Sequence, residues 1–216
     1  MSFFRSFVNT LIHMSNTMNS ERIKIKTRAH PSEGMKILMV RPPRYLWAFH
    51  SERSSFWQPL GFASMAAVLR KAYPDVTVEI LDCPVRGMGW KATKEYVSQS
   101  NPDVVCLGEE TVSAHEAVRL AGFVKQMMPS TVVVAGGPHF SYMVGDTLLN
   151  QPVDFVIRGE GEYPLRDLVG ELRGGRNFSS VPNLSYVARG QIVSNPFGPP
   201  VDMESLPMAA YDLLPM

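Results

Sequence analysis

Two glycine-rich turns are the clearest candidates for a functional role in this sequence. The first, Gly136-Gly137-Pro138-His139, directly follows the apolar run 132–135. The second, Gly159-Glu160-Gly161-Glu162, follows the strand-like run 154–158. Because glycine has no side chain, a large ligand can approach the backbone at such turns. Both turns therefore predict surfaces that hold a ligand.

Several kinds of ligand are excluded by the residues around these turns. The sequence has neither Gly-x-Gly-x-x-Gly after its first strand nor Gly-Lys-Ser/Thr after any strand, which argues against a dinucleotide site and a P-loop. Glu160 and Glu162 stand where a helix is expected to begin, and they would repel a phosphate. Backbone amides and the hydroxyls of Thr111 and Ser113 remain. We therefore expect a large, flat ligand that carries amide groups, rather than a small anion.

The rest of the sequence offers no catalytic arrangement. Arg41-Pro42-Pro43 occupies the position where a phospho-acceptor receiver domain would have clustered acids, and no Ser/His/Asp order stands out. Cys83 and Cys106 match no metal or redox spacing, and Cys106 is expected to be a core residue. The formal net charge of +1 argues against non-specific nucleic-acid binding. No apolar run approaches the roughly 20 residues of a membrane helix, and we expect a cytoplasmic protein.

The elements that must position the two turns form a regular alternation. Strands are predicted at 36–40, 76–81, 103–107, 132–135 and 154–158, each followed by a helical pattern. This repeat predicts an α/β fold: a flavodoxin-like (Rossmann-like), five-stranded parallel sheet in the order 2-1-3-4-5, with helices on both faces. Ligands of such sheets bind beyond the carboxyl ends of the strands. Both turns lie at that edge.

Two flanking regions differ from this repeat. Residues 1–34 are predicted to be an N-terminal extension whose apolar residues recur at helical spacing. It is interpreted as a tail, a helix packed on the domain, a membrane-surface helix, a targeting segment, or the product of an upstream start codon with Met35 opening the domain. The α/β domain is predicted at 35–176. Residues 177–216 are predicted to form a β-hairpin and an extended, proline-rich tail or linker.

The region from residue 35 to 216 resembles the N-terminal cobalamin (B12)-binding domain of B12-dependent radical S-adenosylmethionine (SAM) enzymes. This group includes the anaerobic magnesium-protoporphyrin monomethyl ester cyclase and many methyltransferases. The matching stretches are 102–105, 134–139 and 153–162, together with Pro59-Leu60-Gly61 and the ending 205–215. The two glycine turns are short motifs, but their order at two successive strand ends is a strong signal.

The resemblance implies that cobalamin, with its cobalt ion, lies over the carboxyl edge of the sheet. Carried over position by position, the cofactor-binding residues would be Leu60, Gly61, Glu109, Thr111, Ser113, Gly136, Gly137, Pro138, His139, Gly159, Glu160, Gly161 and Glu162. Alternative roles are helix capping or turn stabilisation for His139, and helix N-terminal carboxylates for the two glutamates of the second turn. No side chain is assigned as a catalytic group or a direct metal ligand.

The sequence departs from related cobalamin proteins in two respects. It lacks the Asp-x-His-x-x-Gly of methionine-synthase-type carriers, although His50 lies in the corresponding loop and Trp57 or Gln58 are alternatives for the position below the cobalt. It also lacks the Cys-x-x-x-Cys-x-x-Cys triad that holds the [4Fe–4S] cluster of radical SAM enzymes. We therefore expect a chain that is not catalytic alone. A truncated or split enzyme joined to, or partnered with, a radical SAM domain or subunit is one interpretation, and a stand-alone B12 module is another.

Two other functions are compatible with the same fold. One is a docking or interaction module that has lost the cofactor. The other is a flavodoxin-like binder of a different small molecule. Retention of a corrinoid by the purified protein would separate the cobalamin-binding hypothesis from both.

Overall fold

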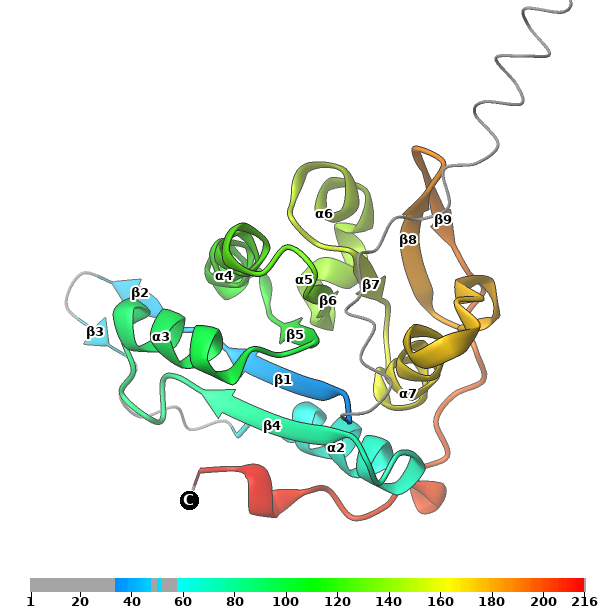
Figure 1. Ribbon diagram of the computed structural model, residues 1–216, viewed down its shortest axis with the longest axis horizontal. Coiled ribbons are helices and arrows are strands. Elements are labelled where there is room, and N and C mark those ends of the chain that lie inside the picture. The colour runs from blue at the N-terminus through cyan, green and yellow to red at the C-terminus, as the bar shows by residue number, and fades with distance from the viewer. Residues whose placement is uncertain (1–33, 48–49, 52–57, 216) are drawn as a thin grey trace, which may run out of the picture.

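A computed structural model describes residues 34–47, 50–51 and 58–215 of the chain (Figure 1). The expectations for residues 1–33, for Trp57 and for the side chain of His50 lie outside this description. In the described part, no helix is long and apolar enough to cross a membrane.

One mixed sheet of seven strands runs through the molecule, in the order β4-β1-β5-β6-β7-β8-β9. Its first five strands are parallel, and this confirms the predicted flavodoxin-like order, because β4 is the second predicted strand and β1 the first. The bounds are β4 (Thr77–Asp82), β1 (Lys36–Arg41), β5 (Val104–Gly108), β6 (Val132–Gly136) and β7 (Phe155–Ile157). In the β5–β6 ladder, Gly108 lies opposite Gly136. The carboxyl ends of these strands therefore meet at one edge, as the repeat predicted.

Helices cover both faces of the sheet (Figure 1). On one face lie α2 (Leu60–Ala72) and α7 (Glu162–Gly170). On the other lie α3 (Trp90–Ser100), α4 (Ala114–Met127), α5 (Gly137–Tyr142) and α6 (Val144–Asn150). The helical pattern after β6 thus forms two helices, α5 and α6, which meet at Met143, and the first begins inside the Gly-Gly-Pro-His turn.

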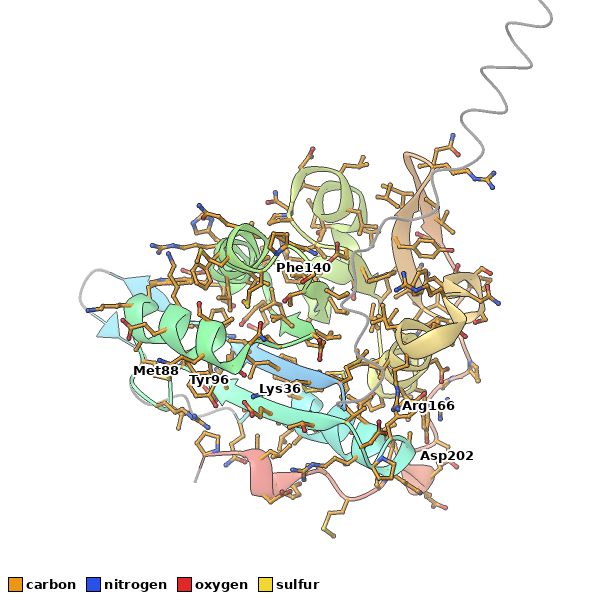
Figure 2. All side chains as sticks on the ribbon, in the orientation of Figure 1. Lys36, Met88, Tyr96, Phe140, Arg166 and Asp202 are labelled. Atoms are coloured by element: carbon orange, nitrogen blue, oxygen red, sulfur yellow. The ribbon has the colours of Figure 1, made fainter. Side chains whose placement is uncertain are left out.

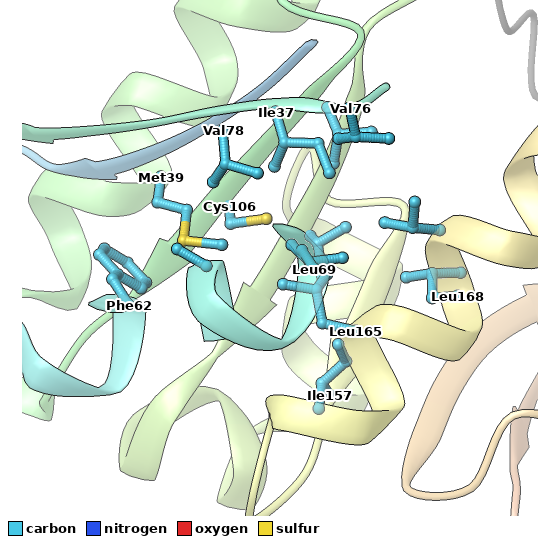
Figure 3. Close-up of a cluster of buried hydrophobic side chains, with 14 of the residues drawn as sticks. Ile37, Met39, Phe62, Leu69, Val76, Val78, Cys106, Ile157, Leu165 and Leu168 are labelled. Atoms are coloured by element: carbon cyan, nitrogen blue, oxygen red, sulfur yellow. The ribbon is translucent and has the colours of Figure 1, made fainter. Parts of the chain in front are cut away.

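The alternation of side chains along the strands produces two separate apolar layers. Ile37 and Met39 point toward α2 and α7, and Leu38 and Val40 point toward the other helices. Figure 3 shows part of the first layer, where Leu165 of α7 meets side chains of α2 and the sheet. In the second layer Phe140 is buried beside α4 (Figure 2). Because both faces are covered, the central strands are apolar throughout rather than alternating with polar residues.

The predicted hairpin is confirmed, and it extends the same sheet. It consists of β8 (Leu184–Ala188) and β9 (Gln191–Ser194), and β8 pairs antiparallel with β7. The predicted end of the α/β domain at residue 176 therefore lies between β7 and β8, which are neighbouring strands of one sheet.

The proline-rich segment after β9 is not a free linker. It returns to α2, where the amide of Ala210 donates a hydrogen bond of 3.0 Å to the carbonyl of Ala63. Ala210 and Leu214 are buried in the layer between the sheet and α2. Burial of a leucine side chain contributes roughly 2 kcal/mol, which exceeds what the exposed ion pair between Arg70 and Asp212 can add. Apolar burial therefore accounts for most of the attachment, and the expectation of an extended linker was wrong for this stretch.

The smaller elements were not predicted individually. The loop after β1 contains the two-stranded pair β2 (Tyr45–Trp47) and β3 (His50–Ser51). A π-helical turn η2 (Glu171–Gly175) continues α7, and four 3-10 turns complete the described elements: η1 (Thr111–Ser113), η3 (Phe178–Ser180), η4 (Met203–Ser205) and η5 (Tyr211–Leu213).

Candidate functional site

A cavity of about 770 Å³ opens at the carboxyl edge of the sheet. It lies among the ends of β1, β5, β6 and β7 and the first turns of α2 and α7. The strand order creates this position, because the chain leaves β1 toward α2 on one face and leaves the neighbouring β5 toward α4 on the other, so that the two loops diverge. The cavity is therefore at the edge that the sequence predicted.

Most of the predicted site residues line this cavity. The turn after β6 and the turn after β7 both do so, from neighbouring strands. The predicted residues at the cavity wall are Gly61, Glu109, Gly136, Gly137, Pro138, Gly159, Glu160, Gly161 and Glu162.

Four predicted residues are not brought to the cavity wall. Leu60 is half exposed on the first turn of α2. Ser113 is buried, and its hydroxyl donates a hydrogen bond of 2.6 Å to the carboxylate of Glu109. His139 and Thr111 face each other, with 3.2 Å between Nδ1 and Oγ1. Ser113 thus lies behind the cavity wall, where it supports Glu109, and the His139–Thr111 pair lies outside the set of lining residues.

The glycines of the cavity wall differ in what a side chain at each position would contact. Gly137 has a φ of +84°, and a Cβ placed there would lie 3.0 Å from the backbone nitrogen of Glu109. A Cβ on Gly161 would lie 2.7 Å from the sulfur of Met65. A Cβ on Gly61 would meet nothing within 4 Å. The expectation that bare backbone leaves room for a ligand was made for the two turns, and it fits Gly136 and Gly159, where a Cβ would meet only ordinary contacts at 3.5 and 3.8 Å. Gly137 and Gly161 instead allow loops and helices to approach one another.

Sequence reasoning missed the apolar inner wall of the cavity. It is formed by Phe62 and Met65 of α2, Cys106 of β5, Val134 of β6 and Leu165 of α7. The signal was present in the alternation of the strands, because Cys106 and Val134 share the face that α2 and α7 cover. The side chains converge because α2 and α7 both start at this edge.

The two cysteines are buried and free. Burial raises the pKa of Cys106 to about 12 and that of Cys83 to about 11. Both remain neutral thiols near neutral pH, so the thiol at the inner wall behaves as a small apolar group rather than a thiolate ligand. Among the described residues, no group of three His, Cys, Asp or Glu side chains could hold a metal ion.

Charged residues form the polar part of the cavity wall, at the carboxyl ends of β1 and β5. Arg44, just after β1, forms an ion pair with the fully buried carboxylate of Glu109. Nearby, the buried pair Arg41–Asp82 joins β1 to β4 at 3.2 Å. Burial raises the pKa of Glu109, while the Ser113 hydrogen bond and the charges of Arg44 and Arg41 act in the opposite direction. These contacts fix the start of the loop after β1 against the end of β5.

Three polar atoms of cavity-lining residues have no hydrogen-bond partner. They are Nε of Arg44, Oε1 of Glu109 and Oε2 of Glu162. A buried polar group without a partner costs about 1–3 kcal/mol. A ligand that carries both N–H donors and carbonyl acceptors has the complementary chemistry, whereas an anion would face two carboxylates.

Comparison with known families agrees with this geometry. A model of the B12-binding domain family matches residues 48–169, which is more than half of the chain. The chain belongs to the B12-binding domain family. The matched region includes both glycine turns and most of the cavity wall. The resemblance inferred from the motifs is thus confirmed.

Two curated proteins illustrate the relatives of this B12-binding domain. It is 31% identical over 184 residues to an uncharacterized methyltransferase, PH0819, of Pyrococcus horikoshii, in a match that covers 84% of this chain and 39% of that protein. It is 28% identical over 177 residues to the anaerobic magnesium-protoporphyrin IX monomethyl ester cyclase of Rubrivivax gelatinosus, covering 78% of this chain and 31% of that protein. The chain thus spans well under half the length of these relatives.

Solved structures show the same fold. The B12-binding domain is similar to the cobalamin-dependent S-adenosylmethionine radical enzyme OxsB with aqua-cobalamin and S-adenosylmethionine bound, at a TM-score of 0.70 and 20% identity, over 85% of this chain and 25% of that one. It is also similar to the radical S-adenosylmethionine methyltransferase TsrM from Kitasatospora setae with cobalamin and a [4Fe–4S] cluster bound, at a TM-score of 0.58 and 23% identity, over 76% of this chain and 31% of that one.

Proposed function

We propose that this chain binds cobalamin in the cavity at the carboxyl edge of the sheet. The single observation that carries the proposal is that the wall of this cavity combines an apolar set of side chains with a polar one. Phe62, Met65 and Leu165 belong to the apolar inner wall, and Arg44 and Glu109 belong to the polar part of the wall. Cobalamin has a matching combination, because its corrin ring carries peripheral carboxamides and its nucleotide tail ends in an apolar aromatic base.

The polar part of the wall would hold the corrin. The unpartnered atoms are buried in the ligand-free protein, so their side chains would shift on binding; carboxamide N–H groups would then supply donors for the oxygens of Glu109 and Glu162, and a carboxamide carbonyl would accept from Nε of Arg44. The exposed backbone at Gly61 leaves space for the flat ring system to approach. The glycine turns after β6 and β7 would complete the surface under the ring.

The inner wall would receive the aromatic base. Removal of an aromatic group from water is favourable by roughly 2–3 kcal/mol when it is fully buried. The neutral thiol of Cys106 adds no charge that would oppose this burial. An adenine or flavin ring, with its larger number of polar edge atoms, would leave hydrogen-bonding groups unmet against the same wall.

When bound, the cobalt of cobalamin supplies alkyl-group transfer or assistance to radical chemistry. The residues of this chain would bind the cofactor, orient it and exclude water from one of its faces. We further propose that the chain serves as the B12-binding portion of a radical SAM methyltransferase- or cyclase-type system. The catalytic portion would be either a continuation of the polypeptide or a separate subunit.

Cofactor retention tests the proposal directly. The protein is incubated with hydroxocobalamin, desalted, and examined by visible spectroscopy, with flavin mononucleotide as a matched control ligand. We expect a corrinoid band at near-unit stoichiometry, a raised melting temperature and no retained flavin. Cobinamide, which lacks the nucleotide tail, is expected to bind more weakly. A colourless protein with an unchanged melting temperature would refute cobalamin binding.

A further inference from the structure

The turn Gly159-Glu160-Gly161 is held in place from a part of the chain that the sequence assigned to the hairpin and linker region. Asn183 lies immediately before β8 and is 8% exposed. Its backbone carbonyl accepts a hydrogen bond of 3.0 Å from the amide of Arg158, just before the turn. Its side-chain Nδ2 donates to the carbonyl of Glu160 at 3.4 Å, within the turn. One residue therefore fixes the turn at two points.

Asn183 also binds the segment that follows β9. Its backbone amide donates to the carbonyl of Pro196 at 3.0 Å, and its side-chain Oδ1 accepts from the amide of Gly198 at 2.7 Å. Between these two positions, Phe197 lies on the guanidinium of Arg158, with 4.5 Å from Cζ to the ring centroid. The turn that lines the cavity and the segment after β9 thus share one bridging side chain.

Asparagine satisfies three requirements at this position. The backbone φ is +62°, a left-handed conformation that asparagine tolerates better than most residues. The Glu160 carbonyl needs a donor, and the Gly198 amide needs an acceptor. A carboxamide offers both on one short side chain, whereas aspartate offers only acceptors.

We propose that Asn183 is a positioning residue of the cofactor site, which holds the turn after β7 in the conformation that receives the ligand. This inference rests on the proposed cobalamin binding. Gly159, Glu160 and Gly161 all line the cavity, and Gly159 and Glu160 are exposed. Gly159 has a φ of +70°, and its amide donates to Oγ of Ser141 in α5 at 3.2 Å, so the turn is held by α5 at its start and by Asn183 at Glu160. Without the bridge the turn would sample more conformations, and binding would have to restore order to it.

Three variants separate this role from general stability. Asn183→Asp keeps the shape and the acceptor for Gly198 but removes the donor to Glu160. Asn183→Gly keeps the left-handed backbone and removes both side-chain bonds. Asn101→Asp is the matched control, because Asn101 is also left-handed, with a φ of +47°, but follows α3 and precedes β5, at the opposite edge of the sheet.

The dissociation constant and dissociation rate of hydroxocobalamin are measured for the wild type and the variants, at a temperature where circular dichroism shows every protein folded. We expect both Asn183 variants to bind about tenfold more weakly, mainly through faster dissociation, and Asn101→Asp to bind as the wild type does. Amide hydrogen exchange without ligand is expected to increase at 159–161 in the Asn183 variants alone.

The outcomes distinguish the two levels of the proposal. If the wild type retains no corrinoid, cobalamin binding fails, and the inference fails with it. If the wild type binds and the folded Asn183 variants bind equally well, only the positioning role is overturned. A fall in melting temperature without any change in affinity or in exchange at the turn would also overturn it, because a merely structural role predicts that result. Should Asn183→Asp not fold, Asn183→Gly decides on the same criteria.

Discussion

Replacement of Gly137 by alanine tests why the turn after β6 begins with bare backbone. The φ of +84° costs an L-residue roughly 1–2 kcal/mol. The new Cβ would also lie 3.0 Å from the nitrogen and 3.1 Å from the oxygen of Glu109, which are backbone atoms and cannot rotate away. Relief of this contact requires a shift of the β5 loop, and we assign it a further cost of about 1–2 kcal/mol. The expected total is about 2–4 kcal/mol.

Gly190→Ala supplies the matched control for this substitution. Gly190 has a φ of +74°, and a Cβ there would meet nothing within 4 Å, so the control carries the backbone cost alone. For a domain of this size, 1 kcal/mol lowers the melting temperature by about 2–4 °C. We therefore expect Gly137→Ala to melt roughly 4–16 °C below the wild type, and Gly190→Ala only about 2–8 °C below it.

Denaturant unfolding of the two variants, followed by circular dichroism, gives the free energies of unfolding needed for the comparison. The difference between the variants isolates the contact with Glu109. If Gly137→Ala were no more destabilising than Gly190→Ala, the close approach of the two loops would have no energetic consequence, and our explanation of this glycine would be refuted. We also expect Gly137→Ala, and not the control, to weaken cobalamin binding.

Three further predictions concern the tail, the thiols and the buried carboxylate. Arg70 lowers the pKa of Asp212, so the small contribution of this exposed pair is present above the ordinary aspartate pKa and is lost as the pH falls through the lowered value; the hydrogen-exchange protection factors at 209–214, corrected for intrinsic exchange at each pH, should fall slightly on acidification in the wild type, and those of Asp212→Asn should lack this pH dependence. Cys83 and Cys106 should not react with a disulfide reagent at pH 8 in the folded protein and should both react after denaturation; rapid reaction of the folded protein would contradict their raised pKa values. The raised pKa of Glu109 means that this carboxyl binds its proton more strongly in the folded state than in the unfolded state. The free energy of unfolding should therefore decrease as the pH rises from the ordinary glutamate pKa through the raised one. The melting temperature of Glu109→Gln should lack this decrease, and an identical pH profile of the melting temperature in both proteins would contradict the raised pKa.

The order of the strands could be predicted because it depends on local patterns and a general rule of handedness. Each apolar run is followed by a helical pattern, and right-handed crossovers leave few arrangements of such units. The positions of Gly136 and Gly159 at one edge follow from that order alone. This is why the sequence alone could predict the edge of the sheet at which the cavity opens.

Other features depend on contacts between distant parts of the chain and carry no local signal. Nothing in the sequence near Ala63 indicates that its carbonyl accepts from Ala210. Proline density predicted an extended linker, and it could not show that this segment is folded back onto α2. The same limit applies to Asn183, which was interpreted as part of a connection because its partners lie in two other segments.

The reasons assigned to individual residues were less secure than their positions. Gly137 was interpreted as an opening for a ligand, and its Cβ position is instead occupied by the backbone of Glu109. Ser113 was expected to face the ligand and instead supports Glu109 from below. In both cases the sequence located the residue in the right part of the fold, but its contacts depend on packing that the sequence does not show.

The attachment of the tail to α2 has a consequence for the order in which the protein is made. Arg70 and Asp212 are separated by 142 positions in the chain, and synthesis at about 5–20 residues per second takes roughly 7–28 s to cover them. During that interval α2 lacks the segment 209–214 that will cover it. The turn after β7 likewise lacks its contacts with Asn183 and Phe197 until those residues have been made. A ligand that requires the turn after β7 to be fixed can therefore bind only after Asn183 and Phe197 have been synthesised.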